Sequence, residues 1–403
     1  MPPIDLPPPD ARTLPLSAAQ QPVLTGEQRV AWLRLIRSEN VGPVTFRELV
    51  NQFGGATEAL AALPVLSRRG GRRTSLRICR RDEAEAELDA VDRLGAQLVA
   101  LGEAGYPPWL ARIDAPPPLL CIKGQPRLVS RPIISIVGSR NGSAAGQKIA
   151  RTLAADLGRQ GFVIASGLAR GIDAAAHRAA LETGTIAVLA GGVDVIYPPE
   201  HAELHRQIAR DGLLVCERPP GLDPRAQDFP RRNRLISGMA AGLIVVEAAR
   251  RSGSLITARF AAEQGREVFA VPGNPLDPRA EGTNGLLKSG ATLVTHADDV
   301  IGALEATLAW RSPPLAGHVN ERDPSLGDES TDAGQSDRAA DDPAATVVRA
   351  RIIEALGAAP IELDEIARAS RCTARDMRVV LLELDLAGRI EHHPGNMVSL
   401  MPA

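Results

Sequence analysis

Residues 131–310 alternate short apolar runs with longer amphipathic stretches. The apolar runs are rich in Val, Ile and Leu, as is typical of strands that are buried on both faces. Stretches of roughly one to two dozen residues with helical spacing separate them. This pattern predicts βαβ units, and therefore an α/β fold with a doubly wound, mostly parallel sheet. The predicted strands are 133–137, 162–165, 185–189, 213–216, 243–246, 267–271 and 292–295.

Residues 23–81 show helical periodicity that glycine turns interrupt. Trp32, Leu35, Leu49 and Leu60 are among the apolar positions, and turns at 41–43 and 53–55 separate the runs. Short helices joined in this way predict a small α-helical module of the SAM or helix-hairpin-helix kind. Such a module either binds a DNA backbone or serves in packing or dimerisation. Seven arginines at its end, within 67–81, form either a solvated linker or a strip that contacts phosphates.

The remaining segments predict further parts of the chain. Residues 1–22 are rich in proline and lack periodicity, which predicts a disordered tail. Residues 82–130 are expected to hold a helix, a strand at 97–101 and a Pro-rich connector, and to pack on the core. Residues 311–345 predict an acidic, disordered linker. Residues 346–403 show three helices and a hairpin turning at 394–396, the outline of a winged helix.

Composition excludes several classes of protein. No stretch of the 403 residues reaches the ~18 uninterrupted apolar positions that a membrane-spanning helix needs. The N-terminus lacks the basic start and apolar run of a signal peptide. The four cysteines lie far apart without a C-x-x-C pair, which argues against a disulfide scaffold or zinc ribbon. We therefore expect a cytoplasmic protein with no membrane association, no metal and no other cofactor.

The net charge of −2 conceals an asymmetry along the chain. Residues 1–130 and 131–310 each carry a net +2, whereas residues 311–345 carry −5 and residues 346–403 carry −1. Placement of charge, rather than its sum, therefore decides whether an anionic partner fits. Aromatic residues number only 11, which limits stacking on bases. A nucleic-acid partner would then be held mainly by its backbone, with low sequence specificity.

In a Rossmann-like sheet, ligands bind beyond the carboxyl ends of the strands, where loops lead into helices. Here those loops combine glycine and serine, which expose backbone N–H groups, with arginine, which suits phosphate oxygens. The alternative is that glycine and serine only permit tight turns. Several such loops along one edge favour a polyanion over a mononucleotide. The candidate DNA-binding residues are Ser139, Arg140, Ser166, Gly167, Arg170, Gly171, Arg231, Arg232, Arg234, Gly253, Ser254 and Thr257.

Catalytic motifs are weak. The first loop lacks G-x-G-x-x-G, no phosphate loop with G-K-[ST] is present, and no nucleophile elbow surrounds Ser166. His201 and His205 follow the order H-x-E-x-H rather than the H-E-x-x-H of zinc enzymes, so we expect both on a helix surface. Glu217 and Glu247 at strand ends are expected to balance nearby arginines. These patterns identify no catalytic residues.

Four motifs in this order on a parallel sheet resemble the DNA-processing protein A (DprA/Smf) family. They are VGSR at 137–140, SGLARGID at 166–173, FPRRNR at 229–234 followed by ISG at 236–238, and SGSLITA at 252–258 closing on VPGN at 271–274. The resemblance covers 105–310 strongly, with the helical module and winged helix as flanks. It implies a bacterial cytoplasmic protein that binds single-stranded DNA without sequence preference, forms a homodimer through its Rossmann-like domain and loads the RecA recombinase during natural transformation. No catalytic activity is implied.

The resemblance also assigns residues. Arg140 and Arg170 would hold phosphates, and Arg231 stands where the family often has lysine. Lysine is scarce throughout, with 3 against 43 arginines, so that replacement follows composition. The third helix of the predicted winged helix carries Arg375 and Arg378 but also acidic residues, so DNA contact and protein contact both stay open.

Two other interpretations stand beside this one. The first is a nucleotide phosphoribohydrolase of the lysine-decarboxylase-like (LOG) family, which has a similar sheet and uses a P-G-G-x-G-T-x-x-E loop. The corresponding stretch here, 251–259, has neither the glycine pair nor the glutamate. The second is a purely structural adaptor, which would not bind DNA even at low salt.

Overall fold

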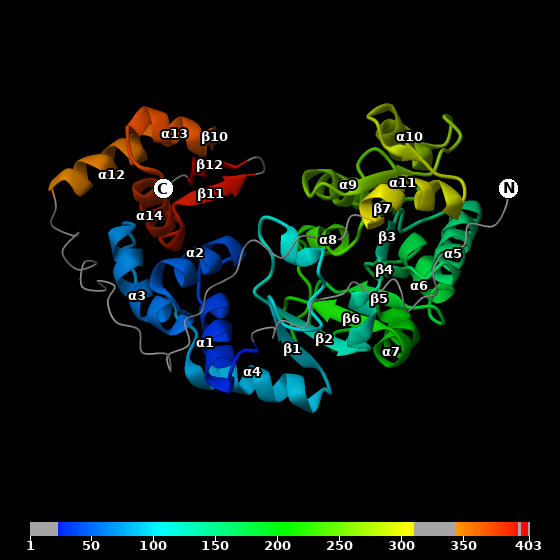
Figure 1. The fold of residues 1–403 in the computed structure, drawn as a ribbon, viewed down its shortest axis with the longest axis horizontal. Coiled ribbons are helices and arrows are strands. Elements are labelled where there is room, and N and C mark those ends of the chain that lie inside the picture. Colours follow the sequence, from blue (N-terminus) through cyan, green and yellow to red (C-terminus); the bar gives the residue numbers. More distant parts are fainter. Residues whose placement is uncertain (1–22, 310–342, 394–395, 402–403) are drawn as a thin grey trace. The chain divides into compact units, whose positions relative to one another are not determined.

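The computed structural model describes residues 23–309, 343–393 and 396–401, which divide into two compact units (Figure 1). The sheet unit begins at Ala86 and runs to residue 309, and the helical unit combines residues 24–85 with 343–401. The division falls inside helix α4 (Arg81–Arg93). The predicted tail at 1–22 and nearly all of the predicted linker at 311–345 lie outside the described residues.

A nine-stranded sheet forms the centre of the sheet unit. Strands β3 to β9 run parallel, whereas β1 and β2 are antiparallel to their neighbours. The chain enters the parallel part in the middle, at β3, and winds outward on both sides, so the topological switch point lies between β3 and β7. In order across the sheet the strands are β1 (Gln97–Ala100), β2 (Leu119–Gly124), β6 (Leu213–Cys216), β5 (Thr185–Val188), β4 (Val163–Ser166), β3 (Ile133–Val137), β7 (Gly242–Val245), β8 (Glu267–Ala270) and β9 (Thr292–Leu293).

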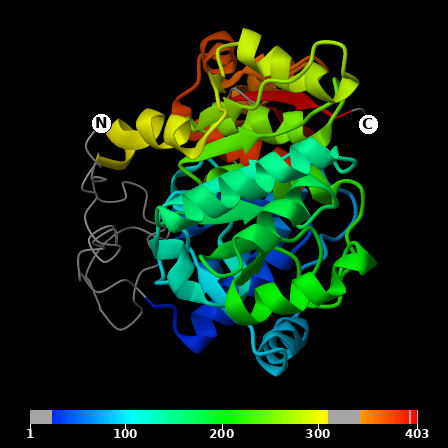
Figure 2. The same ribbon diagram turned by 90° about the vertical axis from the view of Figure 1, so that its right-hand side faces the viewer.

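Helices cover both faces of this sheet, and each face has its own apolar core. In β3, Ile133 and Val137 join one core while Ile134 and Ile136 join the other, as the two-residue period of a strand requires. Figure 2 looks onto the second face, with α5 in front of the strands. Side chains of α8 (Asp228–Gly238) and α9 (Gly253–Glu263) build the first core, and those of α5 (Ala144–Arg159), α6 (Ile172–Ala179) and α11 (Ala297–Ala309) the second. Helices α7 (Ala202–Asp211) and α10 (Glu281–Lys288) complete the unit.

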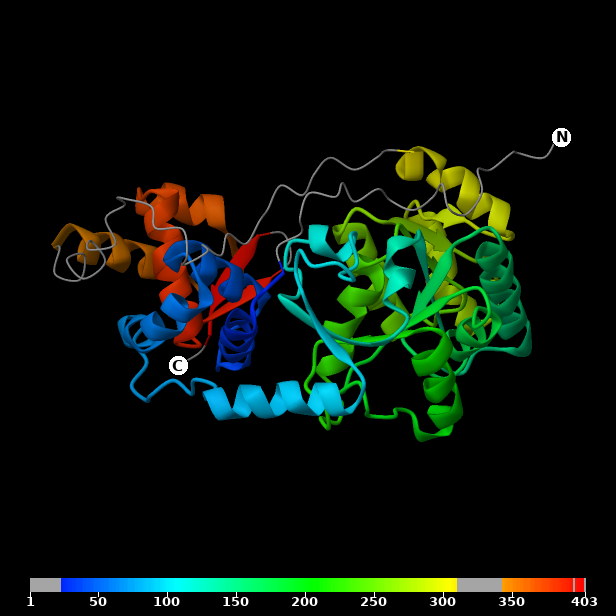
Figure 3. The same ribbon diagram turned by 60° about the horizontal axis from the view of Figure 1, so that its bottom comes forward.

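The helical unit joins the two ends of the chain. Helices α1 (Gly26–Arg37), α2 (Pro43–Phe53) and α3 (Ala56–Arg69) form the predicted helical module, in which the Trp32 and Phe46 rings meet edge to face at 4.9 Å. The winged helix has its own apolar core and packs through α14 on α2 and α3, as Figures 1 and 3 both show. Its elements are α12 (Pro343–Ala355), β10 (Ile361–Glu362), α13 (Leu363–Ser370), α14 (Ala374–Leu386), β11 (Ile390–His393) and β12 (Met397–Leu400).

The predicted fold class is confirmed: a mostly parallel, doubly wound sheet with an N-terminal helical module and a C-terminal winged helix. The seven parallel strands lie within two residues of their predicted bounds. Two strands were not predicted, β2 and the two-residue β10. Because β1 and β2 extend the main sheet, the segment 82–130 contributes strands rather than only packing on the core.

The arginine strip at 67–81 is largely engaged within the helical unit. Four of its seven arginines form ion pairs with carboxylates of the same unit. Arg72 makes two hydrogen bonds of 2.9 Å to Glu39. Arg72 is mostly covered and therefore structural, whereas the other three pairs are exposed and leave both interpretations of the strip open. In the described ranges no helix is both long enough and apolar enough to cross a membrane.

Candidate functional site

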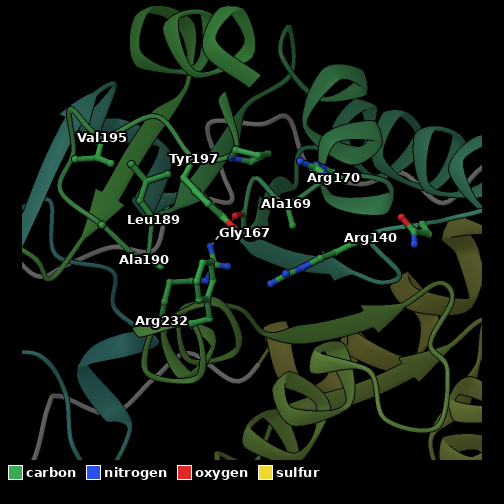
Figure 4. A pocket seen from close by; sticks show the side chains of 13 residues that line it. Arg140, Gly167, Ala169, Arg170, Leu189, Ala190, Val195, Tyr197 and Arg232 are labelled. Atoms are coloured by element: carbon green, nitrogen blue, oxygen red, sulfur yellow. Dashed lines mark hydrogen bonds between the residues drawn. The ribbon is translucent and has the colours of Figure 1, made fainter. Parts of the chain in front are cut away.

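A pocket of about 230 Å³ opens beyond the carboxyl ends of β3, β4 and β5 (Figure 4). The loops that follow these strands and the first turns of α8 enclose it. Its wall combines guanidinium groups with apolar and aromatic side chains. The lining residues are Arg140, Asn141, Gly167, Ala169, Arg170, Leu189, Ala190, Gly191, Val195, Tyr197, Pro198, Phe229 and Arg232.

Arg140 and Arg170 bring positive charge to the opening of the pocket. Arg140 follows β3, is exposed, and has its guanidinium carbon 5.4 Å from the centre of the Phe229 ring. Its guanidinium points across the pocket toward Arg232 (Figure 4). The side chain of Arg170 is 60% exposed and pairs with Glu200. Because exposed ion pairs contribute little, a phosphate can replace that carboxylate at small cost.

Arg232 lies deeper and is committed to the protein. Only 7% of its surface is exposed, and Nη1 donates to the carbonyls of Gly167, at 2.6 Å, and Val188. Burial lowers its pKa to about 10, which leaves it charged at neutral pH. A Cβ on Gly167 would lie 2.8 Å from the guanidinium carbon, so a glycine is needed there. Arg232 therefore shapes the floor of the pocket and adds charge to it from below.

Three backbone N–H groups of the loop from Ser166 to Asp173, those of Gly167, Leu168 and Ala169, are used internally. Asp173 Oδ2 accepts hydrogen bonds from the N–H groups of Gly167, at 3.1 Å, and Ala169, at 3.3 Å. His177 Nε2 accepts a hydrogen bond from the N–H of Leu168 at 3.3 Å. This bond holds Leu168 at a positive φ of 55°. These donors are thus unavailable to an anion, contrary to the expectation that the loop would present them.

Ser166 and Gly171 also differ from the expected ligand-facing placement. Ser166 is fully buried, and its hydroxyl donates to the Ile136 carbonyl at 2.6 Å. Gly171 has a φ of 72°, and a Cβ there would lie 2.7 Å from the Arg140 carbonyl oxygen. Both residues hold the loop that carries Arg170 against the loop that carries Arg140.

A carboxylate fills the anion site expected at the switch point. Glu247, after β7, accepts hydrogen bonds from the backbone N–H of Ser143 at 2.8 Å and from its hydroxyl at 2.5 Å. Ser143 is the N-cap of α5, where an anion would otherwise bind. Glu217 does balance an arginine, since it pairs with Arg234, but Glu247 caps a helix instead.

The other predicted residues lie outside the pocket lining. Arg234 donates to the Ala115 carbonyl and to Glu217, so it is structural. Ser254 and Thr257 are buried in α9. The remaining three, Ser139, Arg231 and Gly253, lie on loops or helix starts at the same edge.

Two aromatic residues in the pocket were missed by the sequence analysis. The rings of Tyr197 and Phe229 lie 5.4 Å apart with an interplanar angle of 56°, and Tyr197 is 47% exposed. Phe229 also lies under Arg232, whose guanidinium carbon is 5.9 Å from the ring centre. The small number of aromatic residues hid the fact that two of them meet here. The signal that could have indicated Phe229 was its position as the first residue of the FPRRNR motif.

The prediction that His201 and His205 lie on a helix surface was wrong. They are 5% and 6% exposed, and a ring nitrogen of each lies at hydrogen-bond distance from a carbonyl oxygen, of Leu168 at 2.9 Å and of Val193 at 3.2 Å. They brace the loops around the pocket. Across the described ranges, no three His, Cys, Asp or Glu side chains gather as a metal site would require.

Three family profiles match successive parts of the chain. The profile described as DNA recombination-mediator protein A matches residues 97–305, just over half of the sequence. The chain belongs to the DprA/Smf family. A DprA-like N-terminal HHH domain matches residues 26–90, and a DprA winged helix domain matches 336–396.

Named relatives of this DprA chain cover most of its length. Protein Smf of Escherichia coli is 37% identical over 326 residues, 80% of this chain and 82% of that protein. Protein Smf of Synechocystis sp. is 30% identical over 400 residues, 92% of this chain and 98% of that one. The X-ray structure of DNA processing protein A from Streptococcus pneumoniae gives a TM-score of 0.57 at 34% identity and covers 70% of this chain and 98% of that one. The resemblance drawn from the motifs is thereby confirmed.

Proposed function

We propose that this DprA chain binds single-stranded DNA without sequence preference at the pocket beyond β3, β4 and β5. The observation that carries the proposal is the Arg140 guanidinium, 5.4 Å from the Phe229 ring centre, beside the exposed Tyr197. A cation and an aromatic face then lie within reach of one nucleotide, the first for its phosphate and the second for its base. Every base has a π-face, so this recognition tolerates any sequence.

We further infer a role for the bound strand. The chain would protect the bound strand and pass it to the RecA recombinase during natural transformation. It would do so in the cytoplasm, as a homodimer joined through the sheet unit. Family membership supports these inferences. They predict faster RecA filament growth on single strands already coated by a single-strand-binding protein when the intact chain is added.

The pocket supports binding rather than catalysis. Of the described residues that line it, none is an aspartate, glutamate or histidine. These are the side chains that most often serve in general acid–base chemistry, and Tyr197 is the one neutral titratable group among the described lining residues. This composition does not favour the alternative of a LOG-like nucleotide phosphoribohydrolase. Release of free base from a nucleoside monophosphate by the purified chain would restore that alternative.

An Arg140→Ala variant tests the proposed site. We expect affinity for an oligothymidylate to fall about tenfold, because one charge-assisted hydrogen bond to phosphate is lost. The slope of log affinity against log salt should flatten by about 0.7. Fluorescence anisotropy across a salt series measures both.

Arg151→Ala is the matched control, since Arg151 is exposed on α5 and does not line the pocket. It should bind as the unmodified chain does. Equal affinities for Arg140→Ala and Arg151→Ala would mean that DNA binds elsewhere. A loss confined to one base composition would contradict the lack of sequence preference.

A further inference from the structure

Helix α14 of the winged helix is buried on two sides. One side packs in the core of the winged helix through Met377, Val380, Leu381 and Leu384. The opposite side carries Leu382, Glu383 and Leu386, which are 2%, 3% and 0% exposed although none belongs to that core. Helices α2 and α3 of the helical module pack against α14. The last two turns of α14 are therefore enclosed between the winged-helix core and the helical module.

Polar groups at the end of α14 accept hydrogen bonds from groups at the start of α2. Thr45, in the first turn of α2, donates its hydroxyl to the Asp385 carboxylate at 2.5 Å. Asn40, in the turn between α1 and α2, donates its amide to the Leu386 carbonyl at 3.1 Å. The end of a helix carries partial negative charge and its start partial positive charge. The two helix ends thus complement one another electrostatically.

The end of α3 fits the middle of α14 closely. Gly70 follows α3, and a Cβ there would clash with the Glu383 carbonyl oxygen and lie 2.7 Å from the Cβ of Ala387. Arg349 of α12 donates both to the buried Glu383 carboxylate and to the Arg69 carbonyl. Separating the buried Glu383 carboxylate from Arg349 would be costly, because it would leave a buried charge without its partner. This contact therefore fixes how the end of α3 is aligned with α14.

The covered side of α14 overlaps, at Leu382, with the side that a DNA-reading helix would present. In helix-turn-helix proteins the recognition helix lies in the major groove with its N-terminal residues contacting the base edges. On α14 that face runs through Arg375, Arg378, Leu382 and Asp385, at helical spacing. Arg375 and Arg378, near the start of α14, are exposed, whereas Leu382 is buried and Asp385 is mostly covered. A major groove about 8.5 Å deep could receive the start of α14, but the enclosed later turns cannot lie along its floor while the helical module covers them.

We propose that α14 is a docking helix for the helical module of its own chain, and that the winged helix does not read DNA through it. The occupant of this surface is the segment from Asn40 to Gly70, which donates to Asp385 and Leu386 and lies against Glu383. The winged helix is accordingly a protein-binding module with an intramolecular partner. This assignment is independent of the function proposed for the pocket.

Thiol labelling of the full-length chain tests the docking. A Leu382→Cys substitution in a Cys372→Ser background places one thiol on the covered side, and the other three cysteines are buried. We expect slow reaction with a maleimide, and a reaction at least tenfold faster when Gly70→Ala is added, because the new methyl group forces α3 away from α14. Fast labelling before that addition would overturn the proposal, and so would no acceleration after it.

Controls separate undocking from unfolding. Gly26→Ala lies in the same module, would place its new Cβ with no other atom within 4 Å, and should leave labelling unchanged. Thr45→Val removes only one hydrogen bond and serves as a milder second variant, with a smaller acceleration. Circular dichroism of each variant should show unchanged helical content. Acceleration by Gly26→Ala equal to that by Gly70→Ala would count against a docked α14.

DNA binding supplies the second arm of the test. The double substitution Arg375→Ala and Arg378→Ala should change affinity for duplex and single-stranded DNA by less than twofold. A tenfold loss for either DNA would overturn the assignment of α14 to protein contact. This result is separate from that for Arg140→Ala, so each proposal can fail alone.

Discussion

His177 shows how a buried side chain shapes the pocket without facing it. Its Nε2 accepts from the Leu168 N–H, so its Nδ1 carries the proton and donates to Thr185 Oγ1 at 2.7 Å. The Thr185 hydroxyl in turn donates to the Ile164 carbonyl at 2.8 Å. Only a neutral imidazole can make this set of bonds, because the charged ring has no acceptor. Burial accordingly lowers the pKa of His177 to about 3.

This lowered pKa predicts acid sensitivity. In the unfolded chain His177 takes up a proton below its usual pKa of 6.5, whereas the folded chain excludes it down to about 3. The free energy of unfolding that neutral His177 contributes is therefore fully present above pH 6.5. It decreases as the pH falls from 6.5 toward 3. At pH 5.5 the loss should be about 1.4 kcal/mol. Urea unfolding at pH 7.5 and 5.5 measures it.

A His177→Gln variant is the comparison for that measurement. Its absolute stability should be lower at both pH values, but the difference between them should shrink by about the same 1.4 kcal/mol. An identical difference in the variant and the unmodified chain would show that other groups account for the acid sensitivity.

At the scale of single residues, the sequence predicted which residue types line the pocket. It did not predict which way each side chain points. Arg140, Gly167, Arg170 and Arg232 were predicted and do line the pocket. Arginine beside a strand end can, however, serve either a ligand or a carbonyl, and Arg232 turned inward because two carbonyls lie next to it. Nothing local in the sequence distinguishes these two outcomes.

At the scale of elements, helix α5 depends on a strand from the other half of the sheet. Glu247 reaches from the end of β7 to the first turn of α5, where a Cβ on Gly146 would lie 2.5 Å from its Oε1 atom. A side chain at Gly146 would displace the Glu247 carboxylate from its hydrogen bonds to Ser143. The carboxylate also complements the partial positive charge of the helix start.

A Gly146→Ala substitution should destabilise the fold by about 1–3 kcal/mol, through overpacking against Glu247. This is the reverse of the usual gain of roughly 1 kcal/mol for alanine over glycine inside a helix. Thermal unfolding measures the sign. Gly285→Ala in α10, where no atom lies within 4 Å of a Cβ, is the control and should be neutral or stabilising. A stabilised Gly146→Ala chain would contradict the contact.

The central strands of the sheet were predicted because they share one physical property. Strands buried on both faces are mainly apolar, so β3 to β7, which are buried at every position, stood out against the amphipathic helices between them. Strand β2 did not, because it follows the prolines at 116–118 and its antiparallel pairing with β6 is non-local. The docking of α14 (Ala374–Leu386) on α3 (Ala56–Arg69) joins positions more than 300 residues apart, and no local pattern predicts such a contact.

At the scale of the whole molecule, charge is distributed unevenly between the site and the rest of the chain. Three arginines line the pocket, yet the protein as a whole carries −2. The segment 311–342 alone contributes −5, with eight acidic residues. Long-range charge acts on the rate and strength of encounter with a polyanion, and salt screens it over about 10 Å at 0.1 M.

Replacing those eight acidic residues by their amides should therefore strengthen DNA binding at low salt and leave it unchanged at high salt. The net charge would change from −2 to +6, so repulsion of the phosphate backbone would become attraction. Anisotropy titrations across a salt series measure the effect. The control variant carries eight replacements at serine and alanine positions of the same segment, which leave the net charge at −2. If the gain persisted at high salt, the segment would act by direct contact rather than by its field. If no gain appeared at low salt, the local charge of the pocket alone would determine affinity.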